Sequence, residues 1–163
     1  GKILVKKINV SKSRIKQLKK KLIIFFTGYS RKSYKILKKQ NDKTNKLDNE
    51  MIDNLHEVKN IGYQSKQIIE NGNLDELGKL MHKHWLYKKE RSPNMTNKII
   101  DKYYNFALKN GALGGKLIGA GGGGFLMFYT NNTKSLEKKF MKLGLKKLDF
   151  NFDFSGTEIV SNN

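Results

Sequence analysis

The chain has 163 residues, of which 37% are hydrophobic, so it can form one core and one domain, or two small domains at most. It has no cysteine, which excludes disulfides, thiolate metal sites and a thiol nucleophile. Lysine and arginine exceed aspartate and glutamate by 19, which makes nucleic acid the first class of partner to consider.

The positive charge is concentrated at the start of the chain. Residues 1–47 contain 16 Lys or Arg and one acid, whereas the remaining 116 residues contain 17 and 13. Only three of the basic residues are Arg, the side chain that bidentate contacts to bases and phosphates require. Three explanations stay open: lysine-rich codon usage on an ordinary surface, phosphate binding by residues 16–21, and a surface that a missing part of the protein covers.

The beginning of the chain predicts a short helix and a strand. It has neither a long apolar stretch nor a small-residue cleavage site, so we expect a cytoplasmic protein with no membrane partner. A start at Gly1 rather than Met leads us to expect a longer natural chain. Residues 13–21 have the apolar spacing of a basic helix, residues 22–27 read as a buried strand, and Gly28 closes it. A helix from Ser30 to about residue 39 and a polar loop over 40–46 follow.

Three helices are predicted in the middle of the chain. Residues 48–71 place Leu47, Met51, Leu55, Val58, Gly62, Ser65 and Ile69 on one helix face, which ends at a glycine. Residues 74–88 form the second helix, with Leu77, Leu80, Met81 and Trp85 facing inward. Residues 97–110 form the third, and its expected inward positions are Ile99, Ile100, Tyr103, Phe106 and Ala107.

The last third of the chain predicts strands around a glycine loop. A strand, the glycine loop and a second strand fit residues 114–130, and a helix fits 133–143. Two short strands are predicted at 146–150 and 157–160. Because the links between strands are short, we expect an α+β domain with an antiparallel sheet and helices on one face.

The glycine loop, residues 119–124, is the one segment with unusual chemistry. Four consecutive glycines between apolar strands indicate repeated positive φ angles, or a backbone or ligand too close for a Cβ. Successive N–H groups in such a loop can bind an anion. The alternative is simple tight packing between two strands.

Three nucleotide-related motifs fit this loop poorly. A dinucleotide-binding loop requires a helix next and an acid about 20 residues later, and both are missing. A P-loop requires Lys and Ser or Thr at its end, where Phe125 stands. The RNA-recognition octamer would place its basic residue at Gly121 and its stacking aromatic at Gly123, so its two binding residues are missing.

The loop and its surroundings resemble a family. Residues 115–126 (GKLIGAGGGGFL) resemble the third motif of the GHMP small-molecule kinases. Four further segments resemble the sugar-kinase branch that includes D-glycero-D-manno-heptose 7-phosphate kinases and, close to them, fucose kinases: residues 26–31 (FTGYSR), 81–89 (MHKHWLYKK), 110–117 (NGALGGKL) and 152–160 (FDFSGTEIV). The resemblance runs from about residue 22 to residue 160.

The resemblance implies a ferredoxin-like domain that is the C-terminal half of a sugar kinase. Residues 1–21 would be a basic lead-in, and 22–160 the domain proper. The N-terminal ATP-binding domain of such kinases, with its Gly/Ser-rich phosphate loop and an Asp that serves the attacking hydroxyl, has no match here. The implied partners are therefore that domain and a sugar or sugar phosphate, with ATP and Mg²⁺ held mainly by the missing half. We expect no catalytic residue and no metal ligand in this chain, and no kinase activity from it alone.

Candidate site residues fall into two groups. The expected phosphate cleft comprises Gly119, Ala120, Gly121, Gly122, Gly123, Gly124 and Lys116, although a solvated Lys116 is the simpler alternative. The expected substrate residues are Thr27, Ser30, Arg31, His82, Trp85 and Lys88. Each of three residues in that group has a simpler alternative role. Ser30 could be a helix N-cap, Trp85 could belong to the core, and His82 could be an ordinary hydrogen-bonded histidine.

Two other classes of function stay open. A small basic nucleic-acid-binding module would place aromatic side chains on an exposed sheet face and would lose affinity steeply with salt. An oligomerisation or regulatory domain is the third class. The kinase half instead predicts an exposed apolar surface where the other domain docks, with the glycine loop at its edge.

Overall fold

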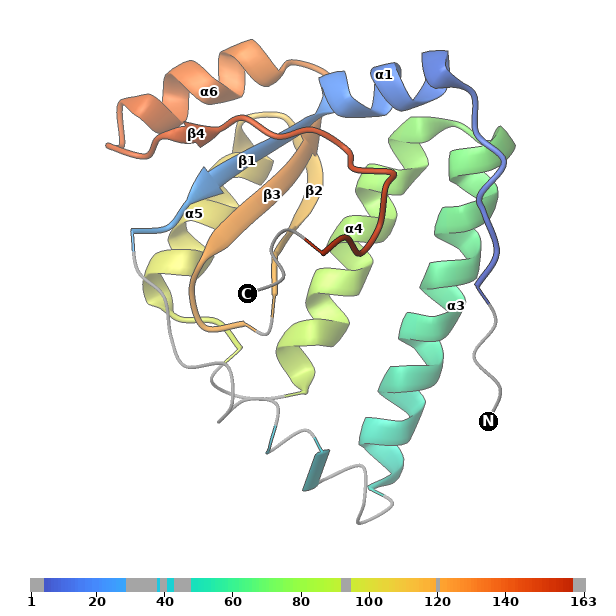
Figure 1. The fold of residues 1–163 in the computed structure, drawn as a ribbon. Helices are drawn as coiled ribbons and strands as arrows, with labels where there is room; N and C mark the ends of the chain where they lie inside the picture. Colours follow the sequence, from blue (N-terminus) through green and yellow to red (C-terminus); the bar gives the residue numbers. More distant parts are fainter. Residues whose placement is uncertain are drawn as a thin grey trace.

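Strands from both halves of the chain form one antiparallel sheet. The computed structural model describes residues 5–28, 38, 41–42, 48–91, 95–119 and 121–159. Within them the strands are β1 (Leu22–Phe26), β2 (Ala112–Leu117), β3 (Phe125–Thr130) and β4 (Lys147–Leu148), in the order β2-β3-β1-β4. The two central strands pair with Ile24 opposite Met127. The predicted α+β fold with an antiparallel sheet is confirmed (Figure 1).

Five helices can be described over their whole length. They are α1 (Lys12–Lys21), α3 (Asn49–Asn71), α4 (Leu74–Glu90), α5 (Lys98–Lys109) and α6 (Thr133–Met141). Each follows a polar residue whose side chain accepts a hydrogen bond from a first-turn N–H group, namely Ser11, Asp48, Asn73, Asn97 and Asn132. The predicted starts of these five helices are therefore confirmed to within one residue. No helix in the described ranges is long and apolar enough to span a membrane.

One face of the sheet holds the main core. Side chains alternate between the two faces of a strand, so Ile23 and Phe25 of β1 meet Leu126 and Phe128 of β3 on this side. Helices α5 and α6 cover it, and the rings of Phe25 and Phe140 stack with 4.3 Å between their centres. This layer fixes the two central strands, and with them both ends of the glycine loop.

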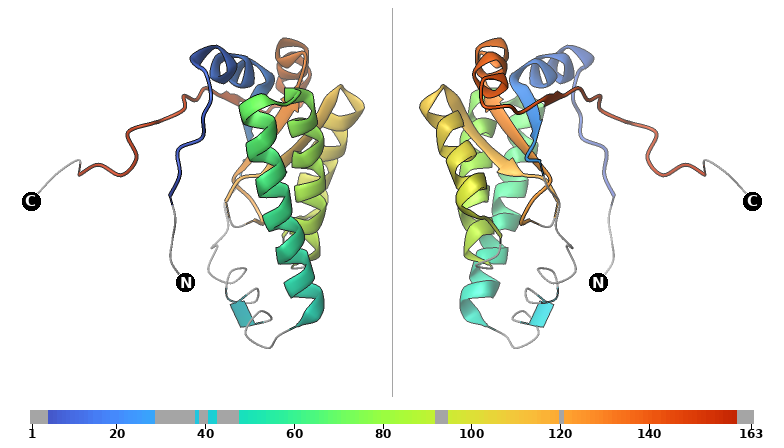
Figure 2. Two further views of the ribbon diagram at one scale, coloured as in Figure 1. Left: turned by 90° about the vertical axis from the view of Figure 1, so that its right-hand side faces the viewer. Right: turned by 90° about the vertical axis from the view of Figure 1, so that its left-hand side faces the viewer.

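The opposite face, which we call the open face, is only partly covered. Helix α4 packs against its β2 side through Leu77 and Met81, and α3 packs on α4. Toward the end of β1 the covering stops, and Phe26 is 42% exposed. Its ring lies beside that of Phe125, with 5.2 Å between centres. Figure 2 shows the N- and C-terminal segments extending away from the body of the domain.

Several sequence-based assignments need correction. Residues 157–159 form no strand, so that part of the strand predicted at 157–160 is wrong. Ile99 is 51% exposed, and Tyr104 takes the core position instead, because α5 is rotated by about one residue from the predicted face. On α3 the buried positions include Asn54 and Ile61 rather than Gly62. The helix predicted from Ser30 and the loop over 40–46 lie almost wholly outside the described residues.

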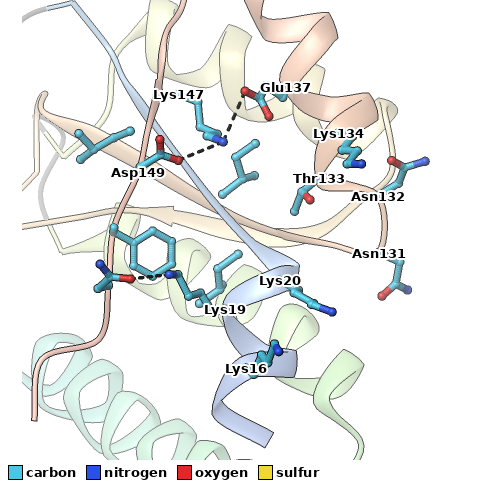
Figure 3. A pocket seen from close by; sticks show the side chains of 15 residues that line it. Lys16, Lys19, Lys20, Asn131, Asn132, Thr133, Lys134, Glu137, Lys147 and Asp149 are labelled. Carbon is cyan, nitrogen blue, oxygen red and sulfur yellow. Dashed lines mark hydrogen bonds and ion pairs between the residues drawn. The ribbon is translucent and has the colours of Figure 1, made fainter. Parts of the chain in front are cut away.

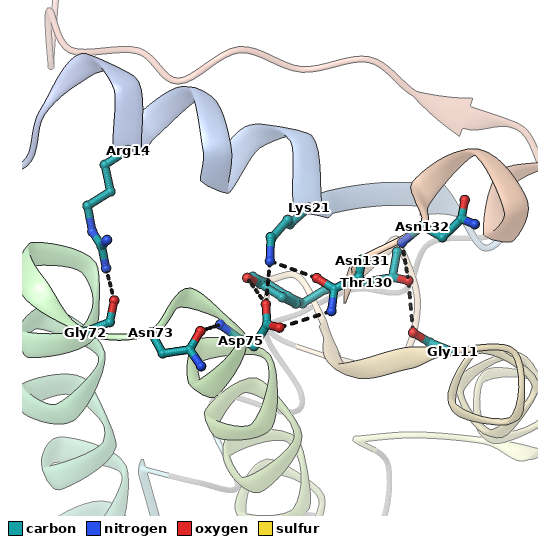
Figure 4. A network of polar contacts seen from close by, with 10 residues as sticks. Arg14, Lys21, Gly72, Asn73, Asp75, Gly111, Thr130, Asn131 and Asn132 are labelled. Atoms are coloured by element: carbon teal, nitrogen blue, oxygen red, sulfur yellow. Dashed lines mark hydrogen bonds and ion pairs between the residues drawn. The ribbon is translucent and has the colours of Figure 1, made fainter.

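Part of the N-terminal basic charge is used to hold the fold together. Arg14 on α1 donates hydrogen bonds to the carbonyl groups of Ile68, Ile69 and Gly72 at the end of α3, where a helix has unpaired acceptors. Figure 4 shows the contact with Gly72. Lys21 forms an ion pair with Asp75 in the first turn of α4. The proposed division into a lead-in (1–21) and a domain proper (22–160) stays a prediction, but α1 is bound to the rest by these contacts.

Asp75 predicts a pH-dependent contribution to stability. Hydrogen bonds from Lys21, Asn131 and Tyr129 favour its ionised form and lower its pKa. A carboxyl group with a lowered folded-state pKa stabilises the protein above its unfolded pKa of about 4, and that stability is lost as the pH falls below it. We expect Asp75→Asn to cost about 1 kcal/mol at pH 7, measured by urea unfolding, and less at pH 3.

The matched control for Asp75→Asn is Glu158→Gln, which removes the same charge from an exposed residue of the C-terminal segment. It should leave the free energy of unfolding unchanged from pH 7 to pH 3. An equal cost of Asp75→Asn at both pH values would contradict the role assigned to the ionised carboxylate.

Candidate active site

The glycine loop joins β2 to β3 at one end of the sheet. The N–H group of Ile118 donates to the carbonyl oxygen of Phe125 over 2.8 Å, so the strand pairing continues to the base of the loop. Four of its glycines have positive φ, namely Gly119, Gly121, Gly122 and Gly124. The predicted need for glycine is confirmed, because L side chains rarely adopt this conformation. Ala120 lies outside the described residues.

The middle of the loop is pressed against Met95, a buried residue that precedes α5. The N–H group of Gly122 donates to the Met95 carbonyl over 2.9 Å. A Cβ on Gly121 would lie 2.3 Å from the Met95 sulfur, closer than any real contact. Glycine is therefore required here by close approach as well as by its φ of +120°.

Both ends of the loop are also anchored. Thr27, directly after β1, donates from its N–H and its hydroxyl group to the Gly124 carbonyl, over 2.9 and 2.8 Å. The structure thus brings Thr27 to the loop, as predicted, although a substrate contact by its hydroxyl stays a prediction. At the other end Lys88 of α4 donates to the carbonyl groups of Leu117 and Gly119.

Lys88 is a buried cation, only 7% exposed. Burial, together with the charges of Lys116 and Arg91, lowers its pKa to about 8. Burial also lowers the pKa of Lys116, and Arg91 adds to that effect. Lys116 is thus half-buried rather than freely solvated, and both lysines lie at the β2 end of the loop.

Two further basic residues join these lysines. His84 and Arg91 share a side of α4 with Lys88, since the spacing is four and then three residues. Burial and the charges of Lys116, Arg91 and Lys88 lower the pKa of His84 to about 4. We call these four residues the basic cluster. Sequence reasoning missed His84 and Arg91, although the helical spacing and the rarity of Arg were available signals.

Four substrate candidates lie elsewhere or outside the described residues. Trp85 has no exposed surface and belongs to the core, so we remove it from the site. His82 meets the hydroxyl group of Tyr104 over 2.8 Å, and that hydroxyl donates to the Gly115 carbonyl. Its described hydrogen bond is therefore to α5 and not to the loop. Ser30 and Arg31 lie outside the described residues.

A cavity of about 1000 Å³ is at the opposite end of the sheet (Figure 3). It lies where β1 begins and β3 ends, and its basic lining residues are Lys16, Lys19, Lys20, Lys134 and Lys147. Lys147 pairs with Glu137 and Asp149, and Lys19 donates to the side chain of Asn151. Residues 16–21 are thus separated from the glycine loop by the length of the central strands, and phosphate binding by them stays a prediction.

Comparison with known proteins finds one matching family model and two similar curated proteins. Residues 65–142 match the model described as GHMP kinases C terminal. Over 159 residues the chain is 29% identical to D-glycero-alpha-D-manno-heptose 7-phosphate kinase of Campylobacter jejuni, covering 94% of this chain and 45% of that one. Over 129 residues it is 27% identical to the bifunctional fucokinase/GDP-fucose pyrophosphorylase of Arabidopsis thaliana, covering 79% and 12%. The chain therefore spans less than half the length of either relative.

The fold is that of a solved kinase. L. major mevalonate kinase, crystallised with R-mevalonate, superposes with a TM-score of 0.67 at 19% identity. The match covers 76% of this chain and 37% of that one. It supports the predicted α+β fold with an antiparallel sheet.

Proposed function

We propose, from the match of residues 65–142 to the GHMP kinases C terminal model and from the curated relatives, that the chain is the C-terminal half of an ATP-dependent sugar kinase. In this proposal the glycine loop borders the cleft in which the γ-phosphoryl group passes to a sugar hydroxyl. The named activities of the two curated relatives, a heptose 7-phosphate kinase and a fucokinase, support a sugar as the acceptor. The setting we propose is the cytoplasm.

The observation that carries the proposal is the way the glycine loop is held. Three separate parts of the chain fix it, through Lys88, Met95 and Thr27. Positioning is most of what an enzyme contributes to phosphoryl transfer, so a loop held this firmly suits the edge of such a site. Simple packing between two strands would not need anchors from α4 and from the segment before α5.

The loop fits phosphate groups better than it fits a metal ion. Backbone N–H groups around positive-φ glycines can face an anion, and the basic cluster lies next to them. GHMP kinases generally use ATP and a divalent metal ion. No group of three or more His, Cys, Asp or Glu side chains that could hold a metal occurs in the described ranges. In this proposal Mg²⁺ and most ATP contacts belong to the half that this chain does not contain, as the family resemblance implies.

The open face is the surface proposed to meet that other half. Phe26 and Ile118 are exposed apolar side chains, and Ile118 directly precedes the loop. The pair of Phe26 and Phe125 is also what the nucleic-acid alternative predicts on a sheet face. The family match and the place of this pair beside the glycine loop favour a domain contact.

The test is to extend the coding sequence upstream of Gly1 and to assay ATP-dependent phosphorylation of sugars and sugar phosphates. We expect a Gly/Ser-rich phosphate loop upstream or in a co-purifying chain, turnover by the completed enzyme, and none by the 163-residue chain alone. ATP turnover by this chain alone would contradict the proposal that catalysis requires the other half of the kinase. So would a completed protein without such a loop.

Within the completed enzyme, Gly121→Ala should lower kcat about 100-fold. The new Cβ would collide with the Met95 sulfur and displace the loop, and a displacement of about 1 Å can cost this much in a positioned reaction. Gly144→Ala is the matched control, because Gly144 has a φ of +79° with open space around it. It places an alanine at a positive φ that is less strained than that of Gly121 and meets no neighbouring atom, so it should leave kcat unchanged. Equal kcat values for the two variants would argue against a role for the loop in the reaction.

A further inference from the structure

The C-terminal segment, residues 150–159, begins with the side-chain pattern of a strand but belongs to no sheet. Phe150, Phe152 and Phe154 are two residues apart, so in an extended chain their rings lie on one side. The ring centres of Phe150 and Phe152 are 5.7 Å apart, and those of Phe152 and Phe154 are 6.5 Å apart, which confirms this arrangement. Polar residues occupy the positions between them. Such alternation is typical of a strand that buries one face.

The backbone of this segment is unpaired as well. Strand β4 ends at Leu148, which lies opposite Ile24 of β1. Beyond it, in the part of the chain that the structure describes, no backbone group of residues 150–159 forms a hydrogen bond with another backbone group. Phe154 is 73% exposed and Ile159 is 83% exposed. An unpaired backbone with exposed apolar side chains is a template for pairing with another polypeptide.

The other half of the proposed kinase lies in the right place to be that polypeptide. In the proposed function this half precedes Gly1, so residues 5–11 connect it to the domain. Figure 2 shows residues 5–11 and residues 150–159 leaving the body of the domain on the same side. The C-terminal segment therefore points to the side from which the chain arrives from the other half.

We propose that residues 150–159 form a strand that pairs with the edge of a sheet in the other half, with Phe152 and Phe154 packed against that half's apolar core. This inference rests on the proposed kinase function. When a strand adds to a sheet edge, backbone hydrogen bonds supply affinity, and pockets for alternate side chains supply specificity. The C-terminal segment is then a second attachment between the halves, in addition to the open face around Phe26.

The first experiment compares amide hydrogen exchange of residues 150–159 in the 163-residue chain and in the completed enzyme. In the chain alone these N–H groups have no backbone acceptor, so they should exchange about as fast as in an unfolded peptide. In the completed enzyme we expect exchange to be at least about 100-fold slower, because the paired strand must open first. Equal rates in the two proteins would overturn the proposal. So would slow exchange in the chain alone, because the segment would then pack on its own domain.

The second experiment replaces Phe154 by Ser. In the completed enzyme Phe154→Ser should lower the Tm by at least about 3 °C and speed up exchange of residues 150–159, since a packed ring is lost. In the 163-residue chain it should leave the Tm unchanged. The matched control is Met141→Ser, which removes a 62% exposed apolar side chain from the end of α6 and should change neither quantity. A completed enzyme that keeps its Tm and exchange rates in Phe154→Ser would overturn the proposal.

Three further outcomes separate this inference from the kinase function and from another partner. Sugar phosphorylation by a completed enzyme in which residues 150–159 exchange rapidly would overturn the inference and leave the kinase function standing. Slow exchange in a completed protein without kinase activity would overturn the kinase function and leave the strand pairing standing. If the 163-residue chain forms dimers in sedimentation that Phe154→Ser abolishes, the partner is a second copy, and the proposal is overturned.

Discussion

Gly114→Ala should be the most damaging small substitution in the domain. A Cβ at Gly114 would lie 2.0 Å from the Gly78 carbonyl oxygen and 2.8 Å from the backbone nitrogen of His82. Both are backbone atoms of α4, so no side-chain rotation can relieve the clash, and the helix must move away from β2. We expect a loss of about 3–5 kcal/mol in the free energy of unfolding and a fall in Tm of roughly 10 °C, measured by urea and thermal unfolding.

Gly62→Ala is the matched control for this substitution. Gly62 of α3 is exposed, and a Cβ there would meet nothing within 4 Å. Because alanine is the better helix former, the variant should be more stable by about 0.5–1 kcal/mol. A Gly114→Ala variant as stable as the wild type would show that α4 and β2 are not in the close contact described here.

The contact between α4 and β2 also explains why the sequence predicted the positive φ angles of the loop glycines but not the close packing at Gly78. Repeated positive φ in residues 119–124 could be predicted, because four consecutive glycines have few other causes. The close approach of Gly78 to the sheet could not, since it depends on how α4 lies across β2. A Cβ on Gly78 would meet the Tyr129 ring at 2.8 Å, a partner 51 residues away in the chain.

Helix starts were predictable because their signals are local. Asp48, Asn73, Asn97 and Asn132 each cap the helix that follows within three residues. The inward faces were less predictable, since an apolar stripe on a short helix allows a rotation of one residue. On α5 the sequence favoured Ile99, but ring contacts with His82 (stacked) and Trp85 (tilted) place Tyr104 in the core.

The sequence predicted the backbone features of the candidate site, but it did not predict which charged side chains are buried there. The glycine loop and Thr27 follow from strand ends and turn chemistry. The burial of Lys88 does not, because a lysine at the end of a helix is normally solvated. It becomes buried because the last carbonyl groups of β2 and the first of the loop need donors, and α4 brings its side chain to them.

Part of the N-terminal positive charge is explained by contacts that stabilise the fold. Arg14 and Lys21 satisfy acceptors at the end of α3 and the start of α4, and Lys19 and Lys147 have polar partners at the large cavity. These are local structural contacts, and none of them reaches the glycine loop. The net charge that first suggested nucleic acid is therefore divided between fold-stabilising contacts, the basic cluster and the remaining surface lysines.

Phe140→Ala should be the most damaging truncation in the core. The ring is completely buried, stacks on Phe25 and lies 5.3 Å from Phe106 between ring centres. Replacing a buried Phe by Ala typically costs about 3–5 kcal/mol, from lost apolar burial and the cavity left behind. Because α6 covers β1 through this side chain, the loss should appear in both urea and thermal unfolding.

The control for Phe140→Ala is Phe154→Ala in the C-terminal segment, where the ring is 73% exposed. It removes the same atoms and should change the free energy of unfolding by less than about 0.5 kcal/mol. Two equally destabilised variants would mean that the C-terminal segment packs on the domain in solution, and two unaffected ones that α6 does not close the core. If only Phe140→Ala is damaging, α6 closes the core while the C-terminal segment stays free of it, next to the open face that we assign to the other half of the kinase.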